Sequence, residues 1–373
     1  MKSIIQVLPA LDQGGVERGT IEIATALQQA GIPNYVVSAG GKMVPELTKI
    51  GVEHIILPVA SKNPFKMWIN AGKLAKIFKE KNAGLIHVRS RAPAWSVKWA
   101  SQKTGVPFIA SYHGVYGIKP TIKKLYNRVM LQGEKVIAVS EHVKKHILAN
   151  YSCPEDKIIV VHRGADVNKF NPDLVSAEKI TSLKQQYQIP EGKTVITLVG
   201  RLTPWKGQKV LLEACRQMKN QDFICLLVGS DQGRTEYHQE LEKMAKDLKQ
   251  QVIFVESCQD MATLYAFSDV VVAPSLEPEA FGRVITEAQA MKRIVVASAH
   301  GGACESIQDG VSGFLTPVGD ASALAETLDK ILSMTPEERL QIQNQAYDSV
   351  HTHFTIQKMC DKTLALYREF LKD

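Results

Sequence analysis

Two glutamates stand eight positions apart across a turn between a predicted strand and a predicted helix. The apolar, β-branched run at 269–273 predicts a buried strand, prolines end it, and helical spacing resumes after Gly282. Glu279 therefore lies on the loop and Glu287 in the early helix. Helical side chains lean toward the start of their helix, so Glu287 can reach the free N–H groups around Phe281 and Gly282. Such a helix start attracts phosphate, and carboxylates beside it can bind sugar hydroxyls.

Two cations follow another predicted strand earlier in the chain. The run at 194–200 predicts a buried strand, and Arg201 and Lys206 straddle the Pro/Gly turn that follows it. In an open α/β sheet, ligands bind at this carboxyl edge of the strands. Arg201 offers a forked set of donors and Lys206 a mobile point charge. Together they suit a diphosphate whose leaving-group charge must be stabilised.

The first half carries two further signals at predicted strand ends. Gly14 and Gly15 follow the first strand-like run, and because they lack side chains the backbone can approach a ligand closely there. The turn is not a dinucleotide-binding fingerprint, because Val16 stands where that pattern needs glycine. His113 follows the apolar run at 107–112 and precedes a glycine, which places it at the ligand-binding edge of its sheet.

Each of these patterns also has a structural interpretation. Glutamates at a helix start commonly compensate the helix dipole, a contribution of about 0.3–1 kcal/mol. A glycine pair can form a tight turn without any ligand, and a lone histidine is usually structural or simply exposed. Ser230, on the loop after the strand-like run at 223–228, is a candidate for base or ribose contacts but an unspecific one. The functional interpretation rests on the joint order and placement of the motifs.

The composition is that of a packed protein with two domains. The 373 residues are too many for one ordinary core, and 45% hydrophobic content argues against disorder. The apolar stretches are strand-sized, so we expect neither a membrane span nor a signal peptide. Six cysteines stand singly, as in the reduced thiols of a cytoplasmic protein. The histidines lack an HExxH pattern, and we expect no metal site.

Positive charge is concentrated in one segment. Residues 61–150 hold seventeen Lys or Arg and three Asp or Glu, whereas the whole chain has a net charge of +7. Apolar side chains interleave with the cations there, which favours an anionic partner such as membrane phospholipid, a phosphorylated glycolipid or nucleic acid. A solvated helix face that aids solubility is the alternative.

Strand-like and helical runs alternate in two series. The first series ends near residue 162, a polar bridge follows at 176–187, and the second series opens at residue 194. This predicts an α/β protein with an N-terminal domain at 1–170, a C-terminal domain at 171–354 and a terminal amphipathic helix at 355–373.

Taken together, the motifs resemble the retaining glycosyltransferases of family 4, which have the GT-B fold. The resemblance runs along the whole chain, and one departure is Ala280, where proline often follows the first glutamate of the pair. That change can alter donor-sugar preference but leaves the carboxylate spacing intact. The residues that carry the resemblance are Gly14-Gly15 with Arg18, His113-Gly114, Arg201 and Lys206, Glu279 with Glu287, and Gly301-Gly302 with Glu305.

The resemblance implies a fold and an activity. The fold has two Rossmann-like, doubly wound domains that face each other across a cleft, the first binding the acceptor and the second the nucleotide sugar. The activity moves a hexose-type sugar, with retention of configuration, from a nucleotide diphosphate sugar to a hydroxyl of a lipid-linked or cell-envelope saccharide of the lipopolysaccharide type. No metal or other cofactor is required. The terminal helix is expected to cross back to the first domain.

The resemblance also implies roles for single residues. His113 contacts the transferred sugar, Glu279 faces the sugar hydroxyls, and Glu287 binds the ribose diol. Arg201 and Lys206 neutralise the leaving diphosphate and complete the catalytic set, and Arg18 lies on the acceptor side. The residues expected to bind the donor are Gly14, Gly15, Arg201, Lys206, Ser230, Phe281, Gly282 and Glu287.

Two other functions fit the same architecture. A nucleotide-sugar 2-epimerase would convert a sugar nucleotide without any acceptor, and a non-catalytic subunit docked on a membrane would bind the nucleotide sugar without turnover. We expect a cytoplasmic enzyme that associates with the inner face of the cytoplasmic membrane through residues 61–150, and no nucleic-acid partner.

Overall fold

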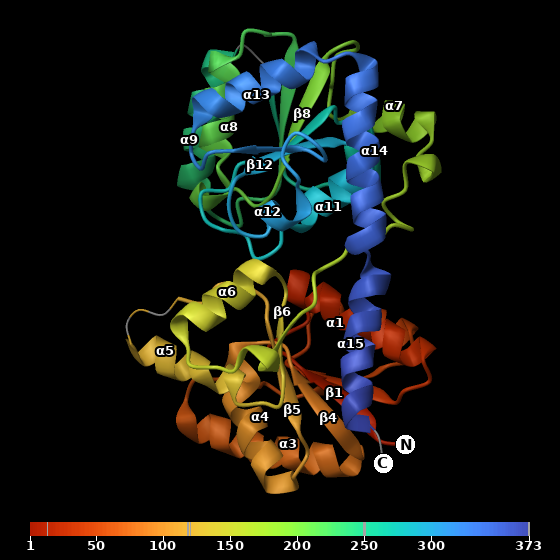
Figure 1. Cartoon of the computed structure of the whole chain (residues 1–373), viewed down its shortest axis with the longest axis vertical. Helices are drawn as coiled ribbons and strands as arrows, with labels where there is room; N and C mark the ends of the chain where they lie inside the picture. The colour runs from red at the N-terminus through yellow and green to blue at the C-terminus, as the bar shows by residue number, and fades with distance from the viewer. Residues whose placement is uncertain (13, 118, 120, 249–250, 372–373) are drawn as a thin grey trace. The chain divides into compact units, whose positions relative to one another are not determined.

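The computed structural model describes the chain except for residues 13, 118, 120, 249–250 and 372–373 (Figure 1). Two positions of the basic segment and the last two of the expected terminal helix therefore lie outside the described residues. The chain folds into two compact units. One comprises Met1–Arg163 and the C-terminal segment from Ile356, and the other comprises Gly164–Thr355.

The first unit is a parallel sheet covered by helices. Its described strands lie in the order β3-β2-β1-β4-β5-β6-β7, so that chain order reverses between β1 and β4. The strands are β1 (Ser3–Val7), β2 (Asn34–Ser38), β3 (Glu53–Ile56), β4 (Ala83–Val88), β5 (Phe108–Tyr112), β6 (Val136–Ala138) and β7 (Ile158–Val160). The helices are α1 (Gly15–Gln29), α2 (Val44–Lys49), α3 (Pro64–Glu80), α4 (Arg91–Thr104), α5 (Thr121–Asn127), α6 (Glu141–Asn150) and α15 (Ile356–Leu371).

Strands of the first unit are buried on both faces, which explains their continuous apolar runs. Every residue of β1 and β5 is buried. On one face, Ile23 and Leu27 of α1 and Met359 and Leu364 of α15 form a single cluster with residues of the sheet, including Ile4. The C-terminal helix thus belongs to the core of the first unit.

The second unit repeats this plan. Its described strands lie in the order β10-β9-β8-β11-β12-β13, all parallel, and chain order reverses between β8 and β11. The strands are β8 (Thr194–Val199), β9 (Phe223–Val228), β10 (Val252–Val255), β11 (Val270–Ala273), β12 (Ile294–Ser298) and β13 (Phe314–Thr316). The helices are α7 (Ala177–Gln186), α8 (Gln208–Gln217), α9 (Thr235–Ala245), α10 (Met261–Phe267), α11 (Arg283–Ala290), α12 (Ala303–Ser306), α13 (Ala321–Ser333) and α14 (Pro336–His353).

The two-residue period of β11 distributes its side chains between two clusters. Val270 and Val272 pack in a cluster that includes residues of α8 and α13, and Val271 packs in another with residues of α11 and α14. α14 begins with a capping box, in which the Thr335 side chain and the Glu338 side chain each satisfy the other residue's backbone N–H. Both faces of the second sheet are therefore covered.

The division between the units falls between Arg163 and Gly164, earlier than the boundary expected after residue 170. The reason is packing: Ala165 donates its N–H to the Phe354 carbonyl at 2.8 Å, and the Phe170 ring lies 5.9 Å from that of Tyr265. These contacts bind residues 164–170 to the second unit.

The α/β class with two doubly wound parallel sheets, predicted from the alternation of strand-like and helical runs, is confirmed. Among the residues that the structure describes, no helix is both long enough and apolar enough to span a bilayer.

Candidate active site

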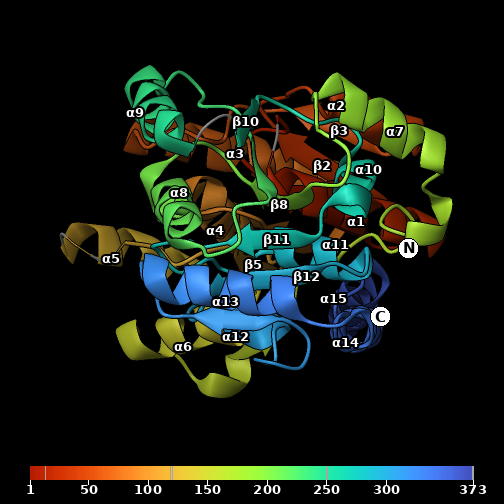
Figure 2. The same ribbon diagram turned by 90° about the horizontal axis from the view of Figure 1, so that it is seen from above.

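The charged residues of the second unit gather where its chain order reverses. β8 and β11 are neighbours in the centre of the sheet (Figure 2). Doubly wound sheets bind ligands outside the carboxyl ends of the strands at such a reversal. Arg201 and Lys206 lie on the loop after β8, and Glu279 lies on the loop after β11. The topology therefore brings the two predicted constellations to one edge of one sheet.

Lys206 and Glu279 form an ion pair. The Lys206 ammonium lies 2.8 Å from Oε1 of Glu279, and the Ser275 hydroxyl donates to the same oxygen at 2.7 Å. The side chains are 14% and 22% exposed, so the pair is largely shielded but still reaches solvent. Within the described part of the chain, Oε2 of Glu279 has no hydrogen-bond donor. That oxygen can accept a hydrogen bond from a ligand hydroxyl.

The two loops approach closely because of a glycine. Gly207 has φ +75°, and a Cβ there would lie 1.9 Å from the Pro274 carbonyl oxygen. The backbones are also bonded directly, since the Leu276 N–H donates to the Trp205 carbonyl at 2.7 Å. A side chain at residue 207 would therefore separate the loop of Lys206 from the loop of Glu279.

Arg201 shares the loop of Lys206 but not its ion pair. Its carbonyl accepts a hydrogen bond from Nε2 of the buried Gln208 at 2.9 Å, which fixes the backbone. The guanidinium is exposed and forms no ion pair with any residue in the described ranges. The backbone of Arg201 is thus fixed, and its guanidinium is accessible to an anion.

Glu287 is held inside the second unit by two neighbours. The Tyr265 hydroxyl donates to Oε2 of Glu287 at 3.2 Å, and Nε of Arg283 lies 3.5 Å from Oε1. Tyr265 is fully buried, and this burial, followed by the nearby Glu287 charge, raises the pKa of its phenol well above the usual value. Tyr265 therefore remains a neutral donor. Sequence reasoning missed it, because a tyrosine within an apolar helix resembles any core residue.

Three further residues of the second unit were predicted to contact the donor, namely Phe281, Gly282 and Ser230. Phe281 is 3% exposed and its ring packs 5.7 Å from that of Phe354, so its side chain belongs to the core of the second unit. Gly282 has φ +85° and is the N-cap of α11. Ser230 lies on the loop after β9, where its Oγ accepts the Gln232 N–H at 3.1 Å.

The predicted residues near the start of the first unit surround the first turn of α1. Gly14 is the N-cap of this helix and Gly15 its first residue, directly after the loop that follows β1. Arg18 binds Glu46 of α2 in a bidentate pair, with distances of 2.6 and 3.1 Å. The pair is about two-fifths exposed on both sides. Arg18 thus already has a carboxylate partner at the position expected to face the acceptor.

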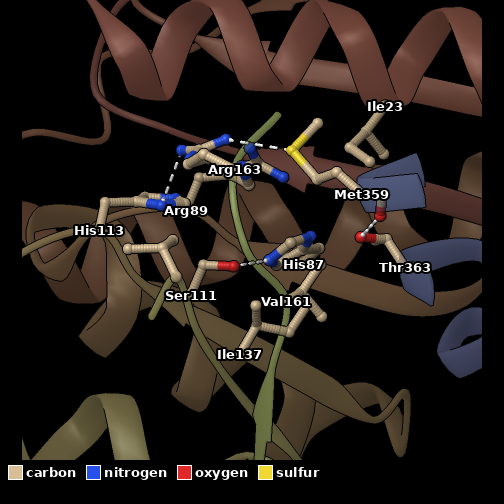
Figure 3. Close-up of a pocket in the computed structure, with 11 residues that line it drawn as sticks. Ile23, His87, Arg89, Ser111, His113, Ile137, Val161, Arg163, Met359 and Thr363 are labelled. Carbon is tan, nitrogen blue, oxygen red and sulfur yellow. Dashed lines mark hydrogen bonds between the residues drawn. The ribbon is translucent and has the colours of Figure 1, made fainter. Parts of the chain in front are cut away.

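His113 follows β5 and lines a pocket with two buried arginines (Figure 3). Nη2 of Arg163 lies 2.9 Å from Nδ1 of His113. Burial, followed by the positive charges of Arg163 and Arg89 and by the nearby His87, holds the pKa of His113 well below its usual value. Nε2 of His113 is buried and has no hydrogen-bond partner among the described residues.

Several polar residues of this pocket were not predicted as site residues. Neither Arg163 nor Arg89 is among the residues that the sequence motifs singled out. His87 is held by the Tyr367 hydroxyl at 2.5 Å on Nδ1 and by the Ser111 hydroxyl at 2.6 Å on Nε2. Because Arg89 and Arg163 follow β4 and β7, the strand-end rule that singled out His113 could also have found them.

The described residues contain no group of three or more His, Cys, Asp or Glu side chains placed to hold a metal ion. Metal independence therefore stays a prediction about the chemistry of the cationic residues.

Two family models match the chain. The model described as "Glycosyltransferase Family 4" matches residues 13–169, and the model described as "Glycosyl transferases group 1" matches residues 179–349.

Solved structures and curated proteins give the same picture. The crystal structure of a glycosyltransferase from Rickettsia africae ESF-5 is 40% identical, with a TM-score of 0.94, over 100% of this chain and 99% of that chain. The structure of Anabaena Alr3699/HepE in complex with UDP-glucose is 23% identical, with a TM-score of 0.86, over 99% and 100%. At that identity the likeness concerns the fold. The D-inositol 3-phosphate glycosyltransferase of Mycobacterium sp. (strain KMS) is 29% identical over 259 residues, which span 64% of this chain and only 57% of that protein's length.

Proposed function

Because the chain belongs to the glycosyltransferases of group 1 and family 4, with the GT-B fold, we propose that it is a retaining hexosyltransferase. It would move a sugar from a nucleotide diphosphate sugar to a hydroxyl of a lipid-linked or cell-envelope saccharide. The donor class is supported by the UDP-glucose complex of the Anabaena protein. The acceptor class is supported by an exposed surface of the first unit.

The observation that carries the proposal is the contact between the loops after β8 and β11. The 2.8 Å ion pair fixes the Lys206 ammonium at the carboxyl edge of the sheet, and the exposed Arg201 lies on the same loop. Two cations on one loop suit the two phosphates of a nucleotide diphosphate. Glu279 places an accepting oxygen next to them, where a sugar hydroxyl can bind.

These residues supply the chemistry that sugar transfer requires. Negative charge develops on the leaving diphosphate as its bond to the sugar breaks. Arg201, Lys206 and the N–H groups at the start of α11 stabilise that charge without reorganising, which is the largest contribution in many enzymes. An ion-pair-like, front-face displacement then keeps the configuration of the sugar. With protein cations in this role, the proposed reaction needs no metal ion.

His113 and the glycines before α1 contribute from the first unit. The imidazole is neutral, so its protonated nitrogen can donate to an oxygen of the transferred sugar without adding charge. Gly14 and Gly15 leave the backbone accessible beside the donor phosphates. Glu287, oriented by Tyr265, accepts hydrogen bonds from the ribose diol.

Exposed apolar side chains with lysines beside them support a lipid-linked acceptor. On α3, Phe65 and Trp68 are 69% and 59% exposed and their rings stack 6.4 Å apart. On α5, Ile122 and Leu125 are 72% and 59% exposed. We refer to these four residues as the apolar surface residues; the lysines that accompany them in sequence are Lys62, Lys66, Lys123 and Lys124. Aromatic groups beside cations suit the headgroup region of an anionic membrane.

Donor binding followed by product analysis tests the proposal. A thermal-shift panel of UDP, GDP, ADP and TDP sugars identifies the donor, because a ligand that binds only the folded state raises the melting temperature. The matching donor is then incubated with lipid-anchored saccharides, and proton NMR of the product reports its anomeric configuration. We expect one donor class to stabilise the protein and the product to retain the donor's configuration.

Three results would contradict the proposal. An inverted product would overturn the retaining mechanism. Conversion of the donor to an epimer without acceptor would indicate an epimerase. Donor binding without turnover by any acceptor in the panel, in protein whose Lys206→Ala variant no longer binds donor, would indicate a non-catalytic subunit.

A further inference from the structure

A hydrogen bond of the first unit has a chemical consequence for His113. Arg163 follows β7 and is only 7% exposed, and its Nη2 donates to Nδ1 of His113 at 2.9 Å. Its Nη1 lies 3.9 Å from Sδ of Met359 in α15. Figure 3 shows the guanidinium directed toward both residues. Contacts with His113 and Met359 inside the first unit therefore orient the Arg163 side chain.

The direction of this hydrogen bond determines the tautomer of His113. Arginine has five N–H donors and no acceptor, so Nδ1 must offer a lone pair. A neutral imidazole that accepts at Nδ1 carries its proton on Nε2. Nε2 is buried and has no partner among the described residues, so its N–H is a donor oriented for an oxygen from outside the chain.

Positive charge in the pocket also favours the neutral form of His113. Protonating His113 would add a third charge beside Arg163 and Arg89 and would break the bond to Arg163, because Nδ1 would then be a donor. The other titratable groups around these arginines and His113 are His87 of β4, Tyr116 after β5, Glu22 of α1, and Cys360 and Tyr367 of α15. The lowered pKa of His113 agrees with this geometry.

A glycine in α1 leaves room for the guanidinium. A Cβ at Gly19 would lie 1.9 Å from Nη1 of Arg163 and 3.0 Å from Nη2 of Arg89. Alanine is otherwise the better residue in a helix, by about 1 kcal/mol. Gly19→Ala therefore displaces Arg163 without removing its charge.

We propose that Arg163 is a positioning residue that fixes His113 in the tautomer protonated at Nε2 and aims that N–H at an oxygen of the transferred sugar. The proposal rests on the proposed function, in which His113 contacts the sugar. This role is distinct from the packing of Arg163 against Met359. It is also distinct from the positive charge of Arg163, which acts on His113 together with that of Arg89.

Nitrogen NMR of the full-length protein labelled with ¹⁵N-histidine tests this directly. Long-range nitrogen–proton correlations distinguish the two neutral tautomers and the imidazolium, and the His113 signals are assigned by their loss in His113→Gln. We expect the parent protein to show the Nε2–H tautomer throughout the range from about pH 6 to 8. Nδ1–H signals in the parent protein would overturn the proposal.

Matched variants separate the hydrogen bond from the charge. Arg163→Met removes both and should release a mixture of tautomers and raise the pKa of His113. Arg89→Met removes a charge but no bond to His113, so its tautomer should stay fixed, and Arg163→Lys should restore the tautomer because it retains a donor. Gly19→Ala should release the tautomer with the arginine still present. An unchanged tautomer in folded Arg163→Met or Gly19→Ala protein would refute the role of Arg163.

Steady-state kinetics separate this inference from the proposed function. Arg163→Met should lower kcat about tenfold with the donor KM nearly unchanged, and Arg163→Lys should recover much of the loss. If the tautomer depends on Arg163 but His113→Gln transfers sugar at the parental rate, the assigned function of His113 fails and the positioning stands. If His113 is needed for transfer but its tautomer ignores Arg163, the inference fails and the function stands.

Discussion

The two units place their candidate sites at the carboxyl edges of their sheets, with different chemistry. In both sheets the chain order reverses next to the first strand of the unit, between β1 and β4 and between β8 and β11. The second unit places an ion pair there, Lys206 with Glu279, and keeps it partly exposed. The first unit places the neutral His113 at the end of β5, among buried arginines. One architecture thus provides a partly exposed ion pair in one unit and an enclosed, neutral imidazole in the other.

The difference indicates a division of labour. Charged side chains that reach solvent can bind a charged group such as a diphosphate. Because water reaches the site, the ligand can also be released. A neutral imidazole held by a buried hydrogen bond adds no charge and offers a donor in a fixed direction. We therefore expect loss of a cation in the second unit to weaken donor binding and catalysis together, and changes at His113 to affect turnover alone.

The largest expected effect is that of Lys206→Ala. The substitution removes a cation from the proposed diphosphate site and leaves Glu279 without its partner, so kcat/KM should fall by about 10²–10³-fold or more. Steady-state kinetics with the identified donor measure this. Lys209→Ala is the matched control, because Lys209 lies in α8 and pairs with Glu240 at the surface. Parental kcat/KM for Lys206→Ala would remove the assigned role of the ion pair.

His113→Ala should separate turnover from affinity. Loss of a positioned proton donor typically costs about 10²-fold in rate, so kcat should fall by that order. Nucleotide affinity, measured by calorimetry, should stay within about twofold, because His113 is proposed to contact the sugar and not the nucleotide. Equal losses of affinity and turnover would break the comparison between the units.

The elements that carry the charged site could be predicted because the signals are local. The strands β8 and β11 are short runs of apolar residues ended by glycine or proline, and such runs have few alternatives in an α/β chain. The strand-end rule then places Arg201, Lys206 and Glu279 at one edge of one sheet. Spacing did not show that Lys206 and Glu279 bond each other, because sequence position does not fix the direction of long side chains.

The contacts that the positioning residues make could not be predicted, because their partners are remote in sequence. Arg163 and His113 are 50 residues apart, and Tyr265 and Glu287 are 22 apart, in elements that meet only in the folded unit. A buried tyrosine in α10 resembles core, and an arginine after β7 resembles a loop cation. The observed boundary after Arg163 lies earlier than the predicted one for the same reason, since Ala165 and Phe170 pack in the second unit.

The apolar surface residues give a prediction about the first unit alone. The double variant Phe65→Ser with Trp68→Ser should weaken co-sedimentation with anionic vesicles at low salt by at least about tenfold, because two large apolar groups no longer enter the headgroup region. Leu340→Ser, at a residue 52% exposed on α14 of the second unit, is the control and should bind as the parent does. Binding that ignores anionic lipid in the parent protein would contradict membrane docking through residues 61–150.

The smallest expected effect is that of Tyr265→Phe, which asks whether the charged site also depends on a buried neutral donor. The ring is retained, so packing against Phe170 should persist, and only the 3.2 Å hydrogen bond to Glu287 is lost. One such bond contributes about 1 kcal/mol, so the donor KM should rise about 3- to 10-fold with kcat little changed. Tyr347→Phe is a matched control, because its hydroxyl makes no hydrogen bond with any described residue.

The pH dependence of Tyr265→Phe distinguishes a positioning role from a charge effect. Burial raises the pKa of the Tyr265 phenol well above its usual value, so the group stays protonated and neutral at every pH used for assay. The ratio of variant to parental KM should therefore be constant from about pH 6 to 9. A ratio that changed within this range would mean that a group titrating there, and not the phenol, governs the contact. A KM equal to the parental value would show that Tyr265 does not position Glu287. The second unit would then lack a positioning residue comparable to Arg163 for His113.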